Sequence, residues 1–152
     1  MTKCVLTWNN SLTTHGDRDG STPLHLASSL RCSNRFQQKE GSNPASVFQA
    51  DNKGLFPIHV AALVGSKDSI SIILEKFPGT AGLCAAQGQT FLHVAVMERS
   101  LTIVSFVCRT PSLAWILNMQ DNDGNTALHL AVQAGKLRMF SSLYGNKEVQ
   151  LI

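Results

Sequence analysis

Histidine and cysteine are the residues in this chain whose side chains could bind a metal or attack a substrate. The 152 residues include five histidines and four cysteines. A cysteine thiol beside a histidine can act as a nucleophile, and clusters of the two residue types bind zinc. The cysteines form no Cys-x-x-Cys pair, so their spacing does not indicate a zinc or redox site. They are Cys4, Cys32, Cys84 and Cys108.

Four of the histidines recur at intervals of 34, 34 and 36 residues, each inside a similar six-residue word. A glycine stands five residues before each of these histidines, and an aspartate stands eight residues before three of them. Self-similarity at such a period is the signature of an internal repeat. The words are Thr22–Ala27, Phe56–Ala61, Thr90–Ala95 and Thr126–Ala131, around His25, His59, His93 and His129.

A repeat of this kind argues against a shared metal site. Equivalent positions on packed helices lie ~8–10 Å apart, whereas zinc needs nitrogen ligands ~2.0–2.1 Å from one ion. We therefore interpret the four imidazoles as structural groups near the start of a helix. They are expected to bond to threonine hydroxyls or turn backbone and to tie adjacent units together. No metal or cofactor is predicted.

Each repeat contains the signals for a turn and two helices. Asp-x-x-Gly is turn chemistry, and Thr followed by Pro suits a helix N-terminus. Gly65 and Gly135 suit the end of a first helix, while Arg31 and Arg99 stand at that position elsewhere and predict a turn made differently. Apolar residues at i, i+3 and i+4 predict a second helix. First helices are expected over about 23–30, 57–64, 91–98 and 127–134, and the second-helix sets include Ile70/Ile73/Leu74, Val104/Val107/Cys108 and Phe140/Leu143/Tyr144.

Two short helices cannot bury their apolar faces alone, so neighbouring hairpins must stack. The predicted fold is all-α, a solenoid of about four helix–turn–helix units with turn or β-hairpin tips. Residues 31–42 are polar, which predicts a frayed helix or loop and a degenerate first unit. The predicted organisation is a lead-in over 1–14, a repeat domain over 15–146 with units at about 17–50, 51–84, 85–120 and 121–146, and a C-terminal tail over 147–152 that looks like a truncated continuation.

Composition narrows the classes of function. The net charge is +3, and only 15% of residues are charged, so neither a nucleic-acid footprint nor a disordered charged tail is indicated. No stretch reaches the ~18 apolar residues of a membrane span, and the N-terminus lacks a signal-peptide pattern. These features predict a cytoplasmic chain with free thiols. Nucleophile-elbow, phosphate-loop and His-Glu-x-x-His motifs are missing from the sequence, so an enzyme is not expected.

The repeated word, its spacing and the helix–turn–helix pattern resemble ankyrin repeats over roughly residues 15–146. The match departs from the pattern at Phe56, where Thr is expected, and at Ala85, where Asp is expected. The resemblance implies a non-enzymatic protein-interaction module without a cofactor, and we expect a monomer. The long linkers that carry the prolines at 44, 78 and 111, together with the segment Gly54–Ala62 around His59, also resemble plant ankyrin proteins of the accelerated-cell-death type. Those proteins carry a C-terminal membrane domain named for a Pro-Gly-Gly motif, which suggests a defence or signalling role and a membrane association for longer forms.

The resemblance places partner contacts on the tips and on the exposed flank of the first helices. Leu55, Leu63 and Met97 would then form an apolar centre with a polar surround, although these positions can equally be ordinary surface. The outward face of the last unit (Met139, Phe140, Leu143, Tyr144) is expected to be an exposed apolar end. The candidate partner-binding residues are Arg18, Asp19, Ser21, Asn52, Lys53, Leu55, Leu63, Gln87, Gln89, Met97, Asn122, Asp123, Asn125 and Gln133.

Two readings of function from different classes remain open at this point. The first is an interaction module that binds an unidentified protein. The second is a marginally stable remnant of a longer array with no function of its own.

Overall fold

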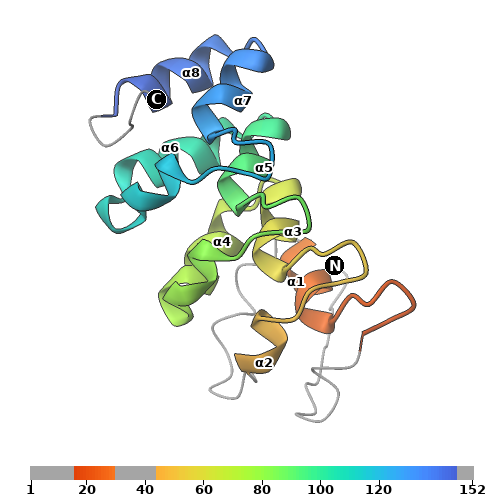
Figure 1. Cartoon of the computed structure of the whole chain (residues 1–152). Coiled ribbons are helices and arrows are strands. Elements are labelled where there is room, and N and C mark those ends of the chain that lie inside the picture. Colours follow the sequence, from red (N-terminus) through yellow and green to blue (C-terminus); the bar gives the residue numbers. More distant parts are fainter. Residues whose placement is uncertain (1–15, 30–43, 147–152) are drawn as a thin grey trace, which may run out of the picture.

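The computed structural model describes residues 16–29 and 44–146, and every structural statement below concerns these residues. The first helices of the units form one row in which each packs against the next (Figure 1). They are α1 (Pro23–Ser29), α3 (Pro57–Leu63), α5 (Phe91–Met97) and α7 (Ala127–Gln133). Their starts agree with the expected ones, and α3, α5 and α7 each end one residue earlier than expected.

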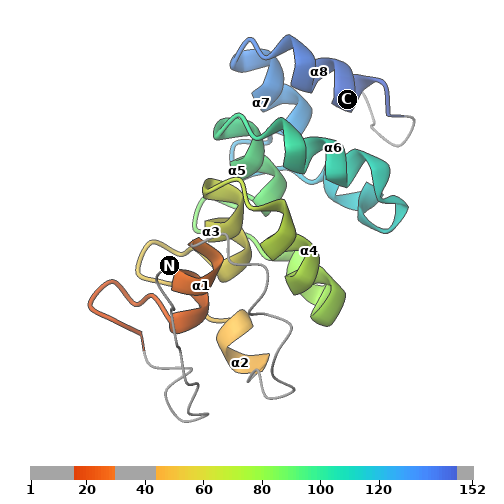
Figure 2. The same cartoon turned by 180° about the vertical axis from the view of Figure 1, so that it is seen from behind.

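The second helices form another row beside the first, on the right-hand side of the reverse view (Figure 2). They are α4 (Lys67–Lys76), α6 (Leu101–Arg109) and α8 (Leu137–Tyr144), and the short α2 (Pro44–Val47) precedes the second tip. The described part of the chain is helical, and its tips are turns without strands. The all-α solenoid is therefore confirmed, with turns as the tips. The proposed frayed segment 31–42, the lead-in 1–14 and the tail 147–152 lie outside the described residues.

The hairpin turns between paired helices all use the left-handed backbone conformation. Gly65 and Gly135 adopt it with φ of 70° and 64°, and Arg99 adopts it with φ of 62°. The prediction of a different turn at Arg99 is therefore wrong. The packing of α5 against α6 keeps the turn in its shape, although a residue with a Cβ is strained in that conformation. Arg31 lies outside the described residues.

The segments that follow the second helices are more than linkers. Pro78 begins the 3-10 helix η2 (Pro78–Gly82), and Pro111 begins the 3-10 helix η3 (Pro111–Asn118). Proline suits the first position of a helical turn because its missing N–H has no partner there. In η3, Leu113, Ile116 and Leu117 are buried in the core. These two segments add buried residues to the interiors of the second and third units, beside those of the two helices.

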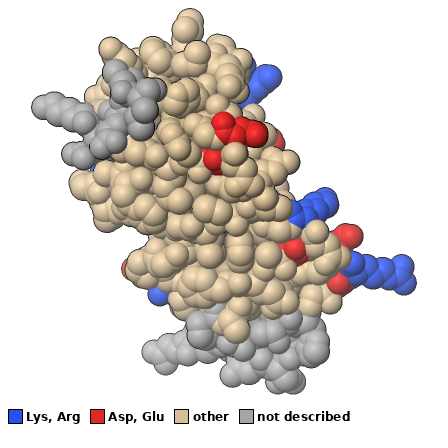
Figure 3. Space-filling view, viewed as in Figure 1, with Lys and Arg blue, Asp and Glu red and all other residues tan. Residues whose placement is uncertain are grey.

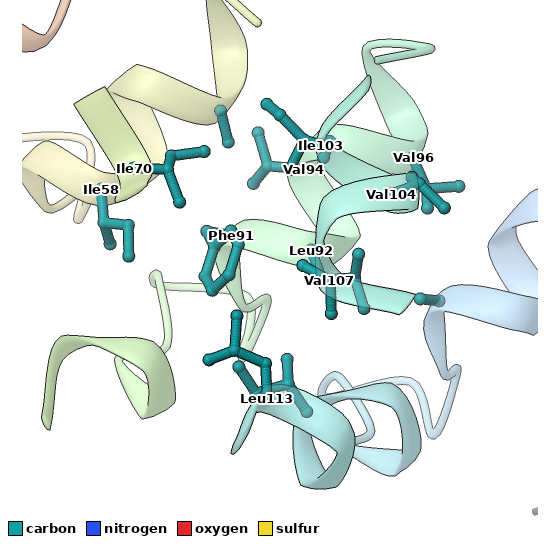
Figure 4. Close-up of a cluster of buried hydrophobic side chains, with 14 of the residues drawn as sticks. Ile58, Ile70, Phe91, Leu92, Val94, Val96, Ile103, Val104, Val107 and Leu113 are labelled. Atoms are coloured by element: carbon teal, nitrogen blue, oxygen red, sulfur yellow. The ribbon is translucent and has the colours of Figure 1, made fainter. Parts of the chain in front are cut away.

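One hydrophobic cluster runs the length of the stack, from Leu24 in the first unit to Leu143 in the last. Figure 4 shows its centre, where side chains from α3, α4, α5, α6 and η3 meet around Phe91. The small residues Ala61, Ala95 and Ala131 are fully buried, which lets neighbouring first helices approach closely. Because no unit encloses a core of its own, each hairpin depends on its neighbours.

The last unit differs from its predicted form. Met139 and Leu143 are buried, with 4% and 1% of their surface exposed, because they face α6 and α7 rather than outward. The prediction that they belong to an exposed end is therefore wrong for these two residues. Phe140 is half-buried and stacks on Tyr144, which is exposed.

Within the described residues, no single helix has the length and apolar content to cross a membrane. The pair α6 and η3 reaches those limits only when joined, and the two are bent by 117° at their junction.

Candidate functional site

The four repeated histidines cap the first helices from inside the stack. In each unit the Nδ1 atom accepts the backbone N–H of the residue three positions earlier, at 3.0 Å for His25 and 3.1 Å for His93. The hydroxyl of that residue lies 2.8 Å from the same nitrogen where it is Thr22, Thr90 or Thr126. The imidazole thus satisfies an N–H that the helix itself leaves without a partner.

The opposite ring nitrogen connects neighbouring units. Nε2 of His25 lies 2.9 Å from the Leu55 carbonyl oxygen, and Nε2 of His59 lies 2.9 Å from that of Gln89. Nε2 of His93 lies 3.0 Å from the Asn125 carbonyl oxygen. Each bond joins a first helix to the following tip. We call these three contacts the histidine bridges.

The hydrogen bonds determine the tautomer of the bridging rings. A backbone N–H can only donate, so Nδ1 must be unprotonated. A neutral ring then carries its proton on Nε2, which donates it to the carbonyl of the next unit. A second proton on Nδ1 would point at the capping N–H and remove the cap. The bridges therefore require neutral imidazoles.

Burial favours this neutral form. Desolvation lowers the pKa of His59 from 6.5 to about 4, against the opposing effect of its bond to the Gln89 carbonyl. Desolvation also lowers the pKa of His93. Both rings are completely shielded from solvent. A buried imidazole with a lowered pKa can belong to a catalytic site, but here both nitrogens are engaged with backbone and threonine groups.

The second unit shows the effect of its departure from the repeated word. Phe56 has no hydroxyl to offer, and its backbone N–H reaches Nδ1 of His59 at 3.4 Å. The two rings pack together instead, with centroids 5.8 Å apart. The cap in this unit is therefore weaker than its three counterparts, while the bridge to Gln89 keeps its length.

The tips are shaped by aspartate carboxylates. Oδ1 of Asp51 accepts the backbone N–H groups of Lys53 and Leu55, each at 2.9 Å. Asp17 and Asp121 make the same pair of bonds in their own tips. The glycine at the end of each turn has a positive φ, between 73° and 78°, which explains why this position recurs as glycine. Ala85 offers no such oxygen, so the third tip lacks this pair of bonds.

Asparagine side chains connect some of the tips to one another. Nδ2 of Asn52 donates to the Arg18 carbonyl at 3.0 Å, and Nδ2 of Asn122 donates to the Ala86 carbonyl at 3.4 Å. Ala86 is the matching residue of the third tip and carries no amide. Asn52 and Asn122 were predicted as partner contacts from sequence, but their amides are already engaged in holding the tips together.

The structure places the other predicted contact residues on two lines along the stack. The middle of the flank is apolar, because Leu63 is 39% exposed and Met97 is 52% exposed. Leu55 is less accessible than these two, since it is half-buried. The backbone carbonyls of Leu55, Gln89 and Asn125 belong to the histidine bridges. Ser21, Gln89 and Asn125 are half-buried. The exposed residues that remain are Arg18, Asp19, Lys53, Gln87 and Asp123 on the tips and Leu63, Met97 and Gln133 on the helices; we call these the tip–flank surface.

Sequence analysis missed several exposed apolar side chains. Leu26 on α1 is 50% exposed, and Trp115 on η3 is 51% exposed. Val132 and Leu137 in the last unit are 58% and 80% exposed. For Val132 the repeat register held the signal, because its counterparts Ser28, Ala62 and Val96 are completely buried within the stack. The exposure of Trp115 had no sequence signal, because it lies in a segment interpreted as a linker.

The cysteine chemistry considered from sequence has no support in the geometry. Cys84 and Cys108 are free thiols, and burial raises the pKa of Cys108, which disfavours the nucleophilic thiolate. No group of three or more His, Cys, Asp or Glu residues in the described part of the chain could hold a metal ion. On the face seen in Figure 3 the charged side chains are scattered and most of the surface carries no charge.

Comparison with known proteins agrees with the repeat geometry. Residues 80–151 match the family model for ankyrin repeats in three copies. The repeated units are ankyrin repeats. Rabankyrin-5 from Mus musculus and from Homo sapiens is 30% identical over 133 residues, which cover 88% of this chain and 11% of the relative.

Other relatives carry different names. The human B-cell lymphoma 3 protein is 28% identical over 130 residues, covering 80% of this chain and 28% of that protein. The probable 26S proteasome regulatory subunit p28 of Saccharomyces cerevisiae is 25% identical over 138 residues, covering 89% of this chain and 59% of the relative. The chain spans about a tenth of the length of Rabankyrin-5.

Proposed function

We propose that this chain is a non-enzymatic protein-interaction module that binds a protein partner through the tip–flank surface. Ankyrin repeats are generally modules of this kind, and the related proteins have no enzymatic names. The observation that carries the proposal is that the recurring and the non-recurring residues of the repeat lie in different places. The recurring histidines, aspartates and alanines are occupied in holding the stack together, while the variable residues between them face solvent.

The tip–flank surface has the composition of a protein interface. Leu63 and Met97 occupy equivalent positions on the adjacent helices α3 and α5, so they form a small apolar centre. Charged and amide side chains, among them Lys53 and Gln87, are exposed on the tips of the same two units. An apolar centre with a polar rim is the common anatomy of protein-binding patches.

Affinity capture with surface variants tests this proposal. We expect Leu63→Glu with Met97→Glu to abolish recovery of a specific partner, because both charges would be buried at the centre of the interface. The matched control is Glu75→Lys with Arg109→Glu, which changes exposed charges at the ends of α4 and α6. Circular dichroism establishes that both variants keep their helices. Recovery of the same partner by the first variant would contradict the proposal.

The alternative function, a remnant without a partner, predicts different solution behaviour. A remnant would melt without a cooperative transition or aggregate, because nothing maintains its packing. The continuous core and the regular bridges favour a cooperative fold instead. Thermal melting combined with size-exclusion chromatography distinguishes the two, and we expect a cooperative monomer.

The narrower plant resemblance suggests a process as well as a mechanism. It places the module in defence or signalling by a membrane-associated protein of the accelerated-cell-death type, and it rests on the prolines at 44, 78 and 111 and on the word around His59. The free thiols of Cys84 and Cys108 are compatible with a cytoplasmic module. Cell fractionation of the tagged chain tests this placement, and recovery from a secreted fraction would contradict it.

A further inference from the structure

The last unit exposes, wholly or in part, two positions whose counterparts in the earlier described units are buried. Val132 on α7 is 58% exposed, whereas the matching residues Ser28, Ala62 and Val96 are completely buried. Phe140 on α8 is half-buried, whereas its counterparts Ile70 and Val104 are completely buried. In the earlier units it is the following hairpin that covers these positions, as the contacts of α3 with α5 and of α5 with α7 show. We call the surface formed by Val132, Phe140 and Tyr144 the end face, in which the rings of Phe140 and Tyr144 stack on each other.

His129 in the last unit likewise has a group whose counterparts contact the next unit. Nδ1 of His129 has its capping bonds to Thr126, at 3.2 Å from the backbone nitrogen and 2.8 Å from the hydroxyl. Its Nε2 atom therefore carries the proton, as in the bridging rings. Within the described residues that proton meets no carbonyl, while His25, His59 and His93 each reach one on the next tip. Position 129 has the donor of a fourth histidine bridge without its acceptor.

We propose that the end face is the docking site for the leading hairpin of another ankyrin-type stack, whose tip carbonyl accepts the proton of His129 Nε2. The three internal interfaces of the protein define what such a partner must present: a tip carbonyl four residues before its own histidine, and a first helix with a small residue at its centre. The proposal adds a second, distinct surface to the tip–flank surface.

Charge gives the partner a further property. The region from Asn125 to Asn146 contains Lys136 and Arg138 and no acidic residue. A second copy meeting this face with its own end face would bring like charges together, which disfavours self-pairing. A hairpin whose second helix is acidic is complementary. The protein's own α4 is electrically balanced, with Asp68 and Glu75 against Lys67 and Lys76, so the second unit brings no excess of like charge to this face.

The second unit therefore serves as the probe. An isolated hairpin does not fold alone, so the probe is tethered, which also raises its effective concentration. Residues 49–84 are appended after Ile152 of the full chain, which puts the copied Asp51 at position 155, 34 residues after Asp121. The copied Leu55 carbonyl, which accepts the His25 bridge in the original, then comes into register with His129.

Urea unfolding and imidazole NMR measure the docking. We expect the extended protein to unfold in one transition at a higher urea concentration than the original. We also expect the Nε2–H of His129 to become a slowly exchanging signal like those of His59 and His93. Two results would overturn the proposal: separate unfolding of the appended residues without a higher urea midpoint, or an Nε2–H of His129 that still exchanges rapidly with water.

Two variants separate docking from general stabilisation. Val132→Arg should change the urea midpoint little in the original chain, because the side chain is exposed, and should remove the gained stability in the extended chain. Gln133→Arg is the matched control, because its counterparts Leu63 and Met97 stay exposed within the stack, and it should change neither. Equal effects of Val132→Arg in both chains would contradict docking. The original chain could instead dimerise as its concentration rises. If Val132→Arg abolished such dimerisation, the end face would bind a second copy of the chain, and the proposed partner would be wrong.

Discussion

At the scale of single residues, the repeated histidine works through its two nitrogens in different ways. One nitrogen accepts the cap of its own helix and the other donates to the next unit. Both tasks need the neutral ring, and the second needs the proton on Nε2. The histidine period was readable from sequence, and so was a role in linking units. The tautomer and the acceptor atoms required coordinates, because they depend on which carbonyl the stacked tip presents.

The stability of the fold is predicted to fall with acidification between pH 6.5 and about 4. The folded pKa of His59 lies below its unfolded value, so in that range the unfolded chain binds more protons and each fall in pH favours unfolding. From the shift of His59 alone we expect a loss of about 2 kcal/mol between pH 7 and pH 5. His93 adds in the same direction. Urea unfolding at both values measures the loss, and His59→Gln should reduce it.

A constant free energy of unfolding from pH 7 to pH 5 would contradict this account of the buried rings.

Replacement of Arg99 by glycine is predicted to stabilise the protein. Arg99 has a left-handed backbone conformation that costs a residue with a Cβ about 1 kcal/mol relative to glycine. We expect Arg99→Gly to raise the free energy of unfolding by about 0.5–1 kcal/mol. Gly135→Ala is the reverse control, because a Cβ at position 135 would meet no atom within 4 Å and its cost reports backbone strain alone. A loss of stability in Arg99→Gly would show that its side chain contributes more than the strain removes.

At the scale of elements, the second, third and fourth units each consist of a tip, a capped first helix and a second helix, and the departures from that plan are local. The helix positions were predictable because proline, threonine and apolar spacing act within one unit. The 3-10 helices η2 and η3 were not, because Leu113 and Ile116 become core residues only when the neighbouring units are in place. The burial of Met139 and Leu143 was missed for the same reason.

The third tip is the weakest by its hydrogen bonds and can be improved. Ala85→Asp places a carboxylate where Asp51 accepts two backbone N–H groups, so the N–H groups of Gln87 and Gln89 gain an acceptor. We expect a gain of about 1 kcal/mol in the free energy of unfolding. Asp51→Ala should produce a loss of similar size, since it removes the same pair of bonds. Urea denaturation compares both variants with the parent, and no gain from Ala85→Asp combined with no loss from Asp51→Ala would show that the carboxylates contribute little.

At the scale of the whole molecule, the histidine bridges and the shared core join the repeats into one continuous stack. The fold class followed from the sequence because the repeat leaves no unit able to fold alone. The candidate partner surface followed only in part. The sequence marks which positions vary, but it does not show that the amides of Asn52 and Asn122 and the carbonyls of Leu55 and Gln89 are already engaged.

Two histidine variants compare a buried ring that caps and bridges with a ring that only caps. His93→Ala removes both bonds and leaves a cavity in a fully buried site, and we expect it to lower the free energy of unfolding by about 3 kcal/mol. His129→Ala removes the cap alone and should cost about 1 kcal/mol. Chemical denaturation of both variants measures the difference, and equal costs would mean that the bridge to Asn125 contributes nothing.

The central claim is that neutral imidazoles join the ankyrin units by donating from Nε2 to the next tip. Long-range proton–nitrogen NMR spectra of the histidine rings at pH 7 test it most directly. The account predicts that His25, His59 and His93 are each protonated on Nε2 alone, with Nε2–H signals that exchange slowly with water. Protonation of His59 or His93 on Nδ1, or on both nitrogens, would contradict it.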